Sequence, residues 1–200
     1  GSGKTTTLYS TLNKMDKPDV NIVTIEDPIE FDLDNINQAQ VNRRSGVTFA
    51  SALRAILRQD PDIIMVGEVR DEETVELAIR AALTGHLVFS TIHTNDSAAG
   101  FTRLLNWGME PFLITSTVKG ILSQRLVRKL CKECREKHMV EPEELTRFGL
   151  EVDESMEFYR AVGCLSCRNT GYRGRVGLFE LIRMNNKIAD LVMEQQPGHV

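Results

Sequence analysis

The first residues of the chain form the second half of a phosphate-binding P-loop. A complete P-loop has the pattern G-x-x-x-x-G-K-[ST], and Gly3, Lys4 and Thr5 supply its last three positions. A helix-periodic stretch and a strand rich in Val and Ile follow, which are the elements of an α/β protein. The first glycine of the motif would precede residue 1, so we expect a fragment that begins within its own phosphate site.

The P-loop predicts where a nucleotide binds. Backbone N–H groups of such a loop face phosphate oxygens, and the N-terminus of the next helix adds a favourable dipole. Lys4 is expected to reach the β- and γ-phosphates, and the hydroxyl of Thr5 to ligate Mg²⁺. The alternative is a glycine turn that happens to precede Lys-Thr. The predicted cofactor-binding residues are Gly1, Ser2, Gly3, Lys4, Thr5 and Thr6, together with Asp27 farther along the chain.

Strands and helices alternate along the first half of the chain. Apolar or β-branched runs at residues 20–25, 63–66 and 87–92 predict strands, and the last two are expected to be buried. Thr48 and Asp71 are favourable N-caps for two helices whose apolar residues recur every three or four positions. This alternation predicts an α/β fold with a mostly parallel sheet covered by helices.

Ionisable residues follow three of these strands. Glu26 and Asp27 end the first, Glu68 the second and His93 the third. Ligands of parallel sheets lie beyond the carboxyl ends of the strands, so these side chains are expected to converge beside the P-loop. Glu68 is predicted to position Mg²⁺ or the attacking water. Glu26 and Asp27 are predicted to contact metal or water, and His93 to sense the γ-phosphate.

Each of these assignments has a structural alternative. Glu68 could be a surface acid that is paired with Arg70. Glu26 and Asp27 could only shape the turn that follows their strand. His93 could help to cap the next helix.

The four cysteines form two C-x-x-C pairs, Cys131 with Cys134 and Cys164 with Cys167. A structural Zn²⁺ site needs four such ligands in a tetrahedron, at about 2.3 Å from the metal. A redox-active C-x-x-C pair is the alternative for either half. The spacing predicts a zinc module over residues 131–167, which contains a short helix from Pro142 to Phe148.

The P-loop, the strand pattern and the cysteine pairs together divide the chain into regions. Residues 1–130 are predicted to be the ATPase core, and 168–200 to return to it and start a helical region. A long helical region is predicted over 111–130, with basic residues in its last turns. Its apolar residues are Ile114, Val118, Ile121, Leu122, Val127 and Leu130.

Composition limits the classes of partner. The 200 residues carry a net charge of −4, and aromatic residues make up 6%. Nucleic-acid binders present basic surfaces and often stacking aromatics, so no nucleic-acid partner is expected. A RecA-like nucleic-acid motor with a zinc module is nevertheless the alternative function. No apolar stretch approaches the length of a membrane span.

Longer motifs support a family resemblance. They are Thr24–Glu30 (TIEDPIE), Leu57–Asp71, Thr84–Asp96, Gln124–Cys131 and Gly171–Glu180. With these motifs the chain closely resembles the ATPases of type II secretion and type IV pilus assembly over essentially all of its residues. The paired cysteines match the assembly and export branch rather than the pilus-retraction branch.

The resemblance implies a RecA-like domain in a homo-hexamer that lies on the cytoplasmic face of the inner membrane. There it would bind a membrane platform protein and turn ATP hydrolysis into growth of a pilus or pseudopilus. The resemblance also makes residues 24–30 the Asp box, Glu68 the catalytic Walker B glutamate and His93 part of the His box. Family members complete the site with arginines from another domain, which this chain is expected to lack.

Overall fold

The computed structural model describes residues 1–147, 149 and 156–196. The chain divides into two compact units, one of residues 1–124 and 179–200 and one of residues 125–178. The helices of the first unit are α1 (Lys4–Met15), α2 (Phe49–Ile56), α3 (Glu72–Leu83), α4 (Ala98–Asn106), α5 (Pro111–Thr117) and α7 (Asn186–Met193). Its strands are β1 (Ile22–Glu26), β2 (Asn37–Gln40), β3 (Ile63–Val66) and β4 (Leu87–Ser90), and it shares β5 (Gly120–Leu130) and β8 (Tyr172–Arg183) with the second unit.

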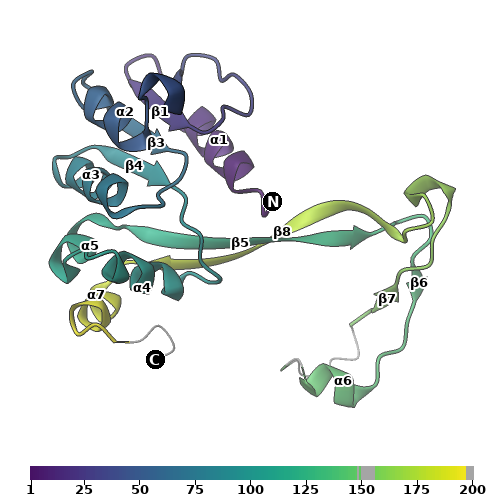
Figure 1. Ribbon diagram of the computed structural model, residues 1–200. Coiled ribbons are helices and arrows are strands. Elements are labelled where there is room, and N and C mark those ends of the chain that lie inside the picture. Colours follow the sequence, from purple (N-terminus) through teal and green to yellow (C-terminus); the bar gives the residue numbers. More distant parts are fainter. Residues whose placement is uncertain (148, 150–155, 197–200) are drawn as a thin grey trace. The chain divides into compact units, whose positions relative to one another are not determined.

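The first unit is built on a four-stranded parallel sheet with the order β2-β1-β3-β4, of which Figure 1 labels β1, β3 and β4. In its register Ile22 lies opposite Ile63, and Ile63 lies opposite Leu87. The predicted α/β fold with a parallel sheet is therefore confirmed. The edge strand β2 was not predicted, because its sequence Asn-Gln-Ala-Gln lacks the β-branched and aromatic residues that favour strands.

Successive residues of β1 and β3 point to opposite faces of the sheet, and both faces are covered. On one face Tyr9 and Leu12 of α1 pack against Ile22 and Met65. The other face carries a larger cluster, which includes Val23 and Ile25 of β1, Leu53 of α2, Ile64 and Val66 of β3 and Val75 of α3. Glu26 lies an even number of residues after Ile22, so it points to the face that α1 covers.

The predicted burial of the third strand was wrong. β3 is buried along its whole length, whereas Leu87 at the start of β4 is 39% exposed. β4 has only one neighbouring strand among the described residues, so one side of it is left uncovered. The strand also ends at Ser90, two residues earlier than its apolar run predicted.

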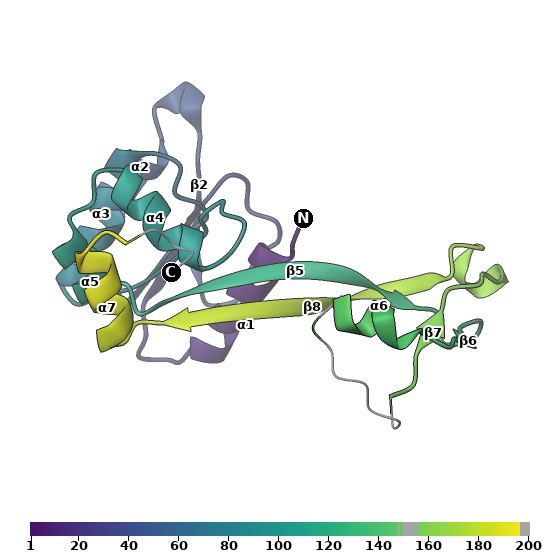
Figure 2. The same ribbon diagram turned by 90° about the horizontal axis from the view of Figure 1, so that it is seen from below.

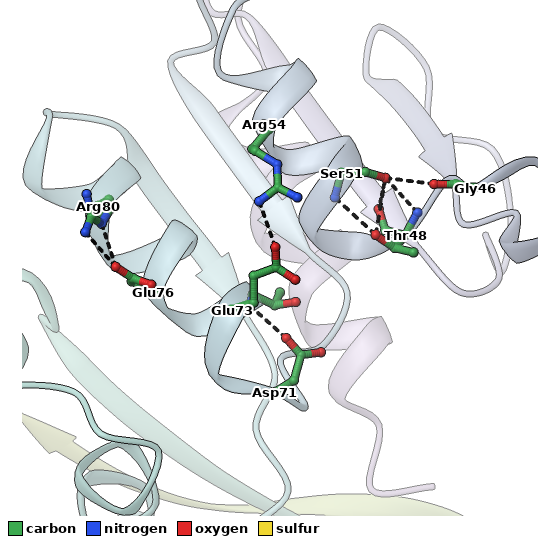
Figure 3. Close-up of polar contacts among 9 residues, drawn as sticks. Gly46, Thr48, Ser51, Arg54, Asp71, Glu73, Glu76 and Arg80 are labelled. Atoms are coloured by element: carbon green, nitrogen blue, oxygen red, sulfur yellow. Dashed lines mark hydrogen bonds and ion pairs between the residues drawn. The ribbon is translucent and has the colours of Figure 1, made fainter.

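Helices α2 and α3 begin where the sequence predicted (Figure 3). Thr48 and Ser51 form a reciprocal capping box at the start of α2. Asp71 accepts a hydrogen bond of 2.8 Å from the backbone N–H of Thr74 at the start of α3. Arg54 and Glu73 form an ion pair of 2.8 Å between the two helices. The Asp71 cap fixes the start of α3 at Glu72, after β3 has ended at Val66.

The long helix predicted over 111–130 was wrong. α5 ends at Thr117, and residues 120–130 form the strand β5, which pairs with β8. The strand begins at Gly120, which lies close to β8. A Cβ at this position would lie 2.8 Å from the carbonyl oxygen of Ile182 on β8. The strand thus depends on a partner that is distant in sequence. In the first unit α4, α5 and α7 group together (Figure 2).

The second unit contains two further strands, β6 (Glu136–Lys137) and β7 (Tyr159–Arg160), which pair in antiparallel fashion. Its helix α6 spans Pro142–Arg147, as predicted, and the predicted end at Phe148 lies outside the described residues. The predicted zinc module falls within this unit. In the part of the chain that the structure describes, no helix has the length and hydrophobicity needed to cross a bilayer.

Candidate active site and metal centre

The P-loop residues lead directly into α1. Gly3 is the N-cap residue and has a φ of 86°, a left-handed conformation that favours glycine. α1 begins at Lys4, and no side chain of the described residues caps it. The first N–H groups of the helix therefore need another acceptor, and a phosphate group fits this need. Lys4 and Thr5 are half-buried, whereas Gly1 and Thr6 are exposed.

Glu68 and His93 are brought together, as the strand ends predicted. The Nε2 atom of His93 lies 3.3 Å from one carboxylate oxygen of Glu68. The Nη2 atom of Arg70 lies 2.6 Å from the other oxygen, and this contact raises the pKa of Arg70. Glu68 therefore pairs with Arg70, as its structural alternative predicted, and also contacts a second predicted site residue. Its side chain is only 12% exposed, so Arg70 and His93 cover most of what solvent could otherwise reach.

Hydrogen bonds between the ends of β3 and β4 hold this pair in place. The N–H of Val69 donates to the carbonyl of Thr91 at 3.0 Å. The hydroxyl of Thr91 donates back to the carbonyl of Gly67 at 2.8 Å. Gly67 also lies against β1, since a Cβ there would come within 3.3 Å of the carbonyl oxygen of Ile25. The glycine before Glu68 thus lets the strand ends approach closely.

Glu26 lies in a buried pocket of hydrogen-bond donors. Its side chain is almost fully buried, and the hydroxyl of Tyr9 on α1 donates to Oε2. The hydroxyl of Thr24 and the amide of Gln38 donate to Oε1, at 2.7 and 3.0 Å. Burial, together with the bond to Glu26, raises the pKa of Tyr9 to about 12. Both oxygens of Glu26 are therefore occupied by protein donors in this structure.

Asp27 is more exposed than Glu26 and forms a separate contact. It lies 3.7 Å from the guanidinium of Arg43. A shallow cavity lies beside this pair and is lined by Asp27, Gln40, Val41, Asn42, Arg43 and Arg44. Asp27 is thus placed at the edge of the sheet where it was predicted, with an arginine in contact.

Sequence reasoning missed three residues of the site, Tyr9, Thr24 and Gln38. Tyr9 falls on the apolar side of a helix and so resembles an ordinary core residue. Thr24 lies within a β-branched run, and Gln38 belongs to the strand that was not predicted. The one available signal was the acid Glu26 at the end of an apolar strand, because a buried carboxylate requires donors around it.

The four cysteines of the second unit form one cluster. Their Sγ atoms all lie within 4.8 Å of one another. Three of the S···S separations are 3.8 to 3.9 Å, whereas a disulfide needs about 2.05 Å. Four thiolates at about 2.3 Å from a tetrahedral Zn²⁺ would lie about 3.8 Å apart. The geometry of Cys131, Cys134, Cys164 and Cys167 therefore fits a tetrahedral metal and not a disulfide.

Backbone N–H groups point at two of these sulfurs. Gly163 donates to Cys134 at 3.3 Å, and Cys164 and Gly171 each donate to Cys167 at 3.2 Å. Burial raises the pKa of Cys134 to about 12. Burial also acts to raise the pKa of Cys167, but the two N–H donors and neighbouring thiols outweigh it and lower that pKa to about 6. Without a cation, the cluster would not hold four thiolates at neutral pH.

Comparisons with known proteins show the family of this chain. A family model described as "Type II/IV secretion system protein" matches residues 1–199. Type II secretion system ATPase E of Vibrio cholerae is 52% identical over 192 residues, which are 96% of this chain and 38% of that protein. The type IV pilus assembly ATPase PilB of Pseudomonas aeruginosa is 50% identical over 197 residues, which are 98% of this chain and 35% of that protein. The chain thus spans less than two fifths of these relatives.

Solved structures of a pilus motor and an ATPase are also similar to this chain. The pilus retraction motor PilT with bound ADP superposes with a TM-score of 0.72 and 33% identity, over 100% of this chain and 49% of that one. The ATPase DotB of Legionella pneumophila superposes with a TM-score of 0.67 and 28% identity, over 100% and 47%. The family that the motifs predicted is confirmed, and the chain belongs to the type II/IV secretion system proteins.

Proposed function

We propose that this chain is the RecA-like ATPase core of a motor that powers type IV pilus assembly or type II protein secretion. The observation that carries the proposal is the contact between Glu68 and His93 at the ends of two adjacent parallel strands. The hydrogen bond from Tyr9 to Glu26 ties the P-loop helix to the end of a third strand. Names of the relatives support an ATPase of this kind.

Each residue of the site has a proposed task. Lys4 and the first N–H groups of α1 bind the β- and γ-phosphates of ATP, and the hydroxyl of Thr5 ligates Mg²⁺. Bound Mg²⁺ would neutralise charge that develops on the phosphates. Glu68 accepts a proton from the water that attacks the γ-phosphate, and phosphate and ADP are the products. His93 contacts the γ-phosphate from the end of β4.

Asp27 and Glu26 take different parts in the proposal. Asp27 is half-exposed and is available to a metal-bound water. Glu26 is buried among three donors and contacts the P-loop helix, so it positions that helix relative to the sheet. A direct catalytic role for Glu26 would require these donors to move.

The cysteine cluster is proposed to hold one structural Zn²⁺. Its S···S separations match a tetrahedral site, and its N–H donors stabilise thiolates. Four cysteine ligands leave no open position, so this metal would stabilise the second unit rather than take part in hydrolysis.

The proposed assembly follows the relatives. They are named as components of secretion and pilus machines, so we propose a homo-hexamer on the cytoplasmic face of the inner membrane, bound to a platform protein. The alternative, a nucleic-acid motor, has no support from the relatives. It predicts that nucleic acid stimulates ATP hydrolysis.

The proposed nucleotide site is tested with one lysine substitution and a matched control. In the full-length protein, Lys4→Ala should abolish binding of a fluorescent ATP analogue. Lys14→Ala, in the last turn of the same helix, should bind it as the wild type does. Tight binding by Lys4→Ala would rule out the P-loop as the site. Hydrolysis by the wild type should be unchanged when DNA or RNA is added.

A further inference from the structure

Strand β5 makes a side-chain hydrogen bond to the helix that carries the P-loop lysine. The hydroxyl of Thr7, on α1, donates to Oε1 of Gln124 at 2.7 Å. The two residues are 117 positions apart, and both are half-buried. Thr7 lies one helical turn after Lys4, so this bond joins the first turns of α1 to the β5–β8 ribbon.

Strand β8 makes a corresponding contact to the segment that follows His93. The backbone N–H of Ser97 donates to Oε1 of Glu180 at 2.8 Å, and the hydroxyl of Ser97 donates to the same carboxylate. Ser97 is fully buried and immediately precedes α4. β5 is thus bonded to the helix that carries Lys4, and β8 to the segment between His93 and α4.

The hydroxyl of Thr7 does not need Gln124 in order to find an acceptor. A threonine hydroxyl in a helix can donate to the carbonyl one turn earlier, as Thr11 does to Thr7 at 2.8 Å. Thr7 bonds to Gln124 instead. The start of α4 already has a local cap, because Asp96 accepts from the N–H of Ala99 at 2.7 Å. Gln124 therefore gives the Thr7 hydroxyl a long-range partner where a short-range one is available. Glu180 accepts the buried N–H of Ser97, which the Asp96 cap leaves unsatisfied.

We propose that Gln124 and Glu180 are positioning residues that couple nucleotide binding to the order of the ribbon. The inference rests on the proposed nucleotide site at Lys4. Phosphate binding fixes the first turns of α1, which carry Thr7. The hydrogen bond from Thr7 to Gln124 then restricts the motion of β5. β5 ends at Leu130, directly before Cys131, so the strand whose motion is restricted is the one that leads to the cysteine cluster. Reciprocity requires that a bond which favours the bound state also strengthens nucleotide binding.

The test is amide hydrogen exchange of residues 121–130 in the full-length protein, with and without a non-hydrolysable ATP analogue. Exchange in the wild type should slow by about five-fold on binding, which is the effect expected of one hydrogen bond. Thr7→Val and Gln124→Leu should lose most of this change. Thr7→Ser and Gln124→Glu keep a donor and an acceptor, so they should retain it. Thr11→Val is the matched control on the same helix and should also retain it.

Glu180 is tested in the same way on residues 172–183. Glu180→Leu should lose the response, and Glu180→Gln, which keeps the acceptor oxygen, should retain it. Binding of the analogue is measured on every sample. A wild type that does not bind the analogue contradicts the proposed nucleotide site, and with it this inference. A wild type that binds it without slower exchange, or Thr7→Val and Gln124→Leu proteins that respond fully, overturns the coupling alone.

Discussion

The hydroxyl of Tyr9 donates a hydrogen bond to Oε2 of Glu26, and both side chains are buried. Removing the hydroxyl leaves a buried carboxylate oxygen without this donor. We predict that Tyr9→Phe lowers the free energy of unfolding by about 1–3 kcal/mol. Denaturant unfolding measures this loss. Tyr172→Phe, in the second unit, is the control and should cost less, because Tyr172 is only half-buried. Equal stability of Tyr9→Phe and wild type would contradict the prediction.

The same contact predicts a pH dependence. Burial and Glu26 raise the pKa of Tyr9 to about 12, above the value near 10 that a tyrosine has in an unfolded chain. Its contribution to stability is therefore complete below about pH 10 and is lost as the pH rises towards 12. The stability difference between wild type and Tyr9→Phe should shrink over that range. Ultraviolet titration should also show one phenol fewer ionising near pH 12 in Tyr9→Phe.

Glu68 is predicted to act in hydrolysis rather than in binding. In the full-length protein, Glu68→Gln should bind ATP normally while the turnover number falls by about 10²–10³, the usual cost of one preorganised electrostatic contact. Glu76→Gln removes a surface acid that is paired with Arg80, so it should have near-normal turnover. ATP hydrolysis and analogue binding are measured in parallel. Near-normal turnover of Glu68→Gln would contradict the catalytic role of Glu68 and make Glu26 the next candidate.

Part of this site could be predicted from where the strands end in the sequence. Glu68 and His93 were predicted to converge because each follows an apolar run, and parallel strands end at one edge. The environment of Glu26 could not be predicted in this way. Its donors come from α1, β1 and β2, and β2 has no strand signal in its own sequence. The pairing with β1, rather than any local preference, makes this segment a strand.

In residues 111–130, too, pairing with a distant strand overrides the local sequence preference. Ile114, Val118, Ile121 and Leu122 recur at helical spacing, and the basic residues that follow favour helices. The helix nevertheless stops at Thr117, because the strand β5, which pairs with β8, begins at Gly120. The partner strand lies beyond the whole cysteine segment, so no local window of sequence contains the information that decides the outcome.

The cap of α3 gives a stability prediction. Asp71 accepts the N–H of Thr74, whose side chain is buried, so Asp71→Ala should cost about 1 kcal/mol (Figure 3). Glu76→Ala breaks an exposed pair on the same helix and should cost about 0.5 kcal/mol or less. Thermal or denaturant unfolding of both variants measures the difference. A larger loss from Glu76→Ala would reverse the ranking and contradict the capping argument.

Metal removal should act on one unit only. We predict one Zn²⁺ per chain, and loss of it should loosen residues 125–178 while the parallel sheet stays folded. Elemental analysis and amide exchange before and after chelation test this. Cys134→Ser should lose the metal, and Ser166→Ala, between the last two cysteines, should keep it. Freshly reduced protein that lacks zinc, or that forms a disulfide within either pair, would count against the site.

The charges around the site indicate that assembly affects hydrolysis. Arg70 and Arg43 are both paired with acids, Glu68 and Asp27, so they already balance negative charge of the protein. Transfer of the γ-phosphoryl group needs further positive charge, and an arginine from a neighbouring domain or subunit contributes about 10³–10⁵ in rate in other NTPases. We therefore expect the specific ATPase activity of the full-length protein to rise with protein concentration as hexamers form. An ATPase titration, with light scattering on the same samples, measures both quantities. Brisk turnover by a monomer at every concentration would show that the site is complete within one chain.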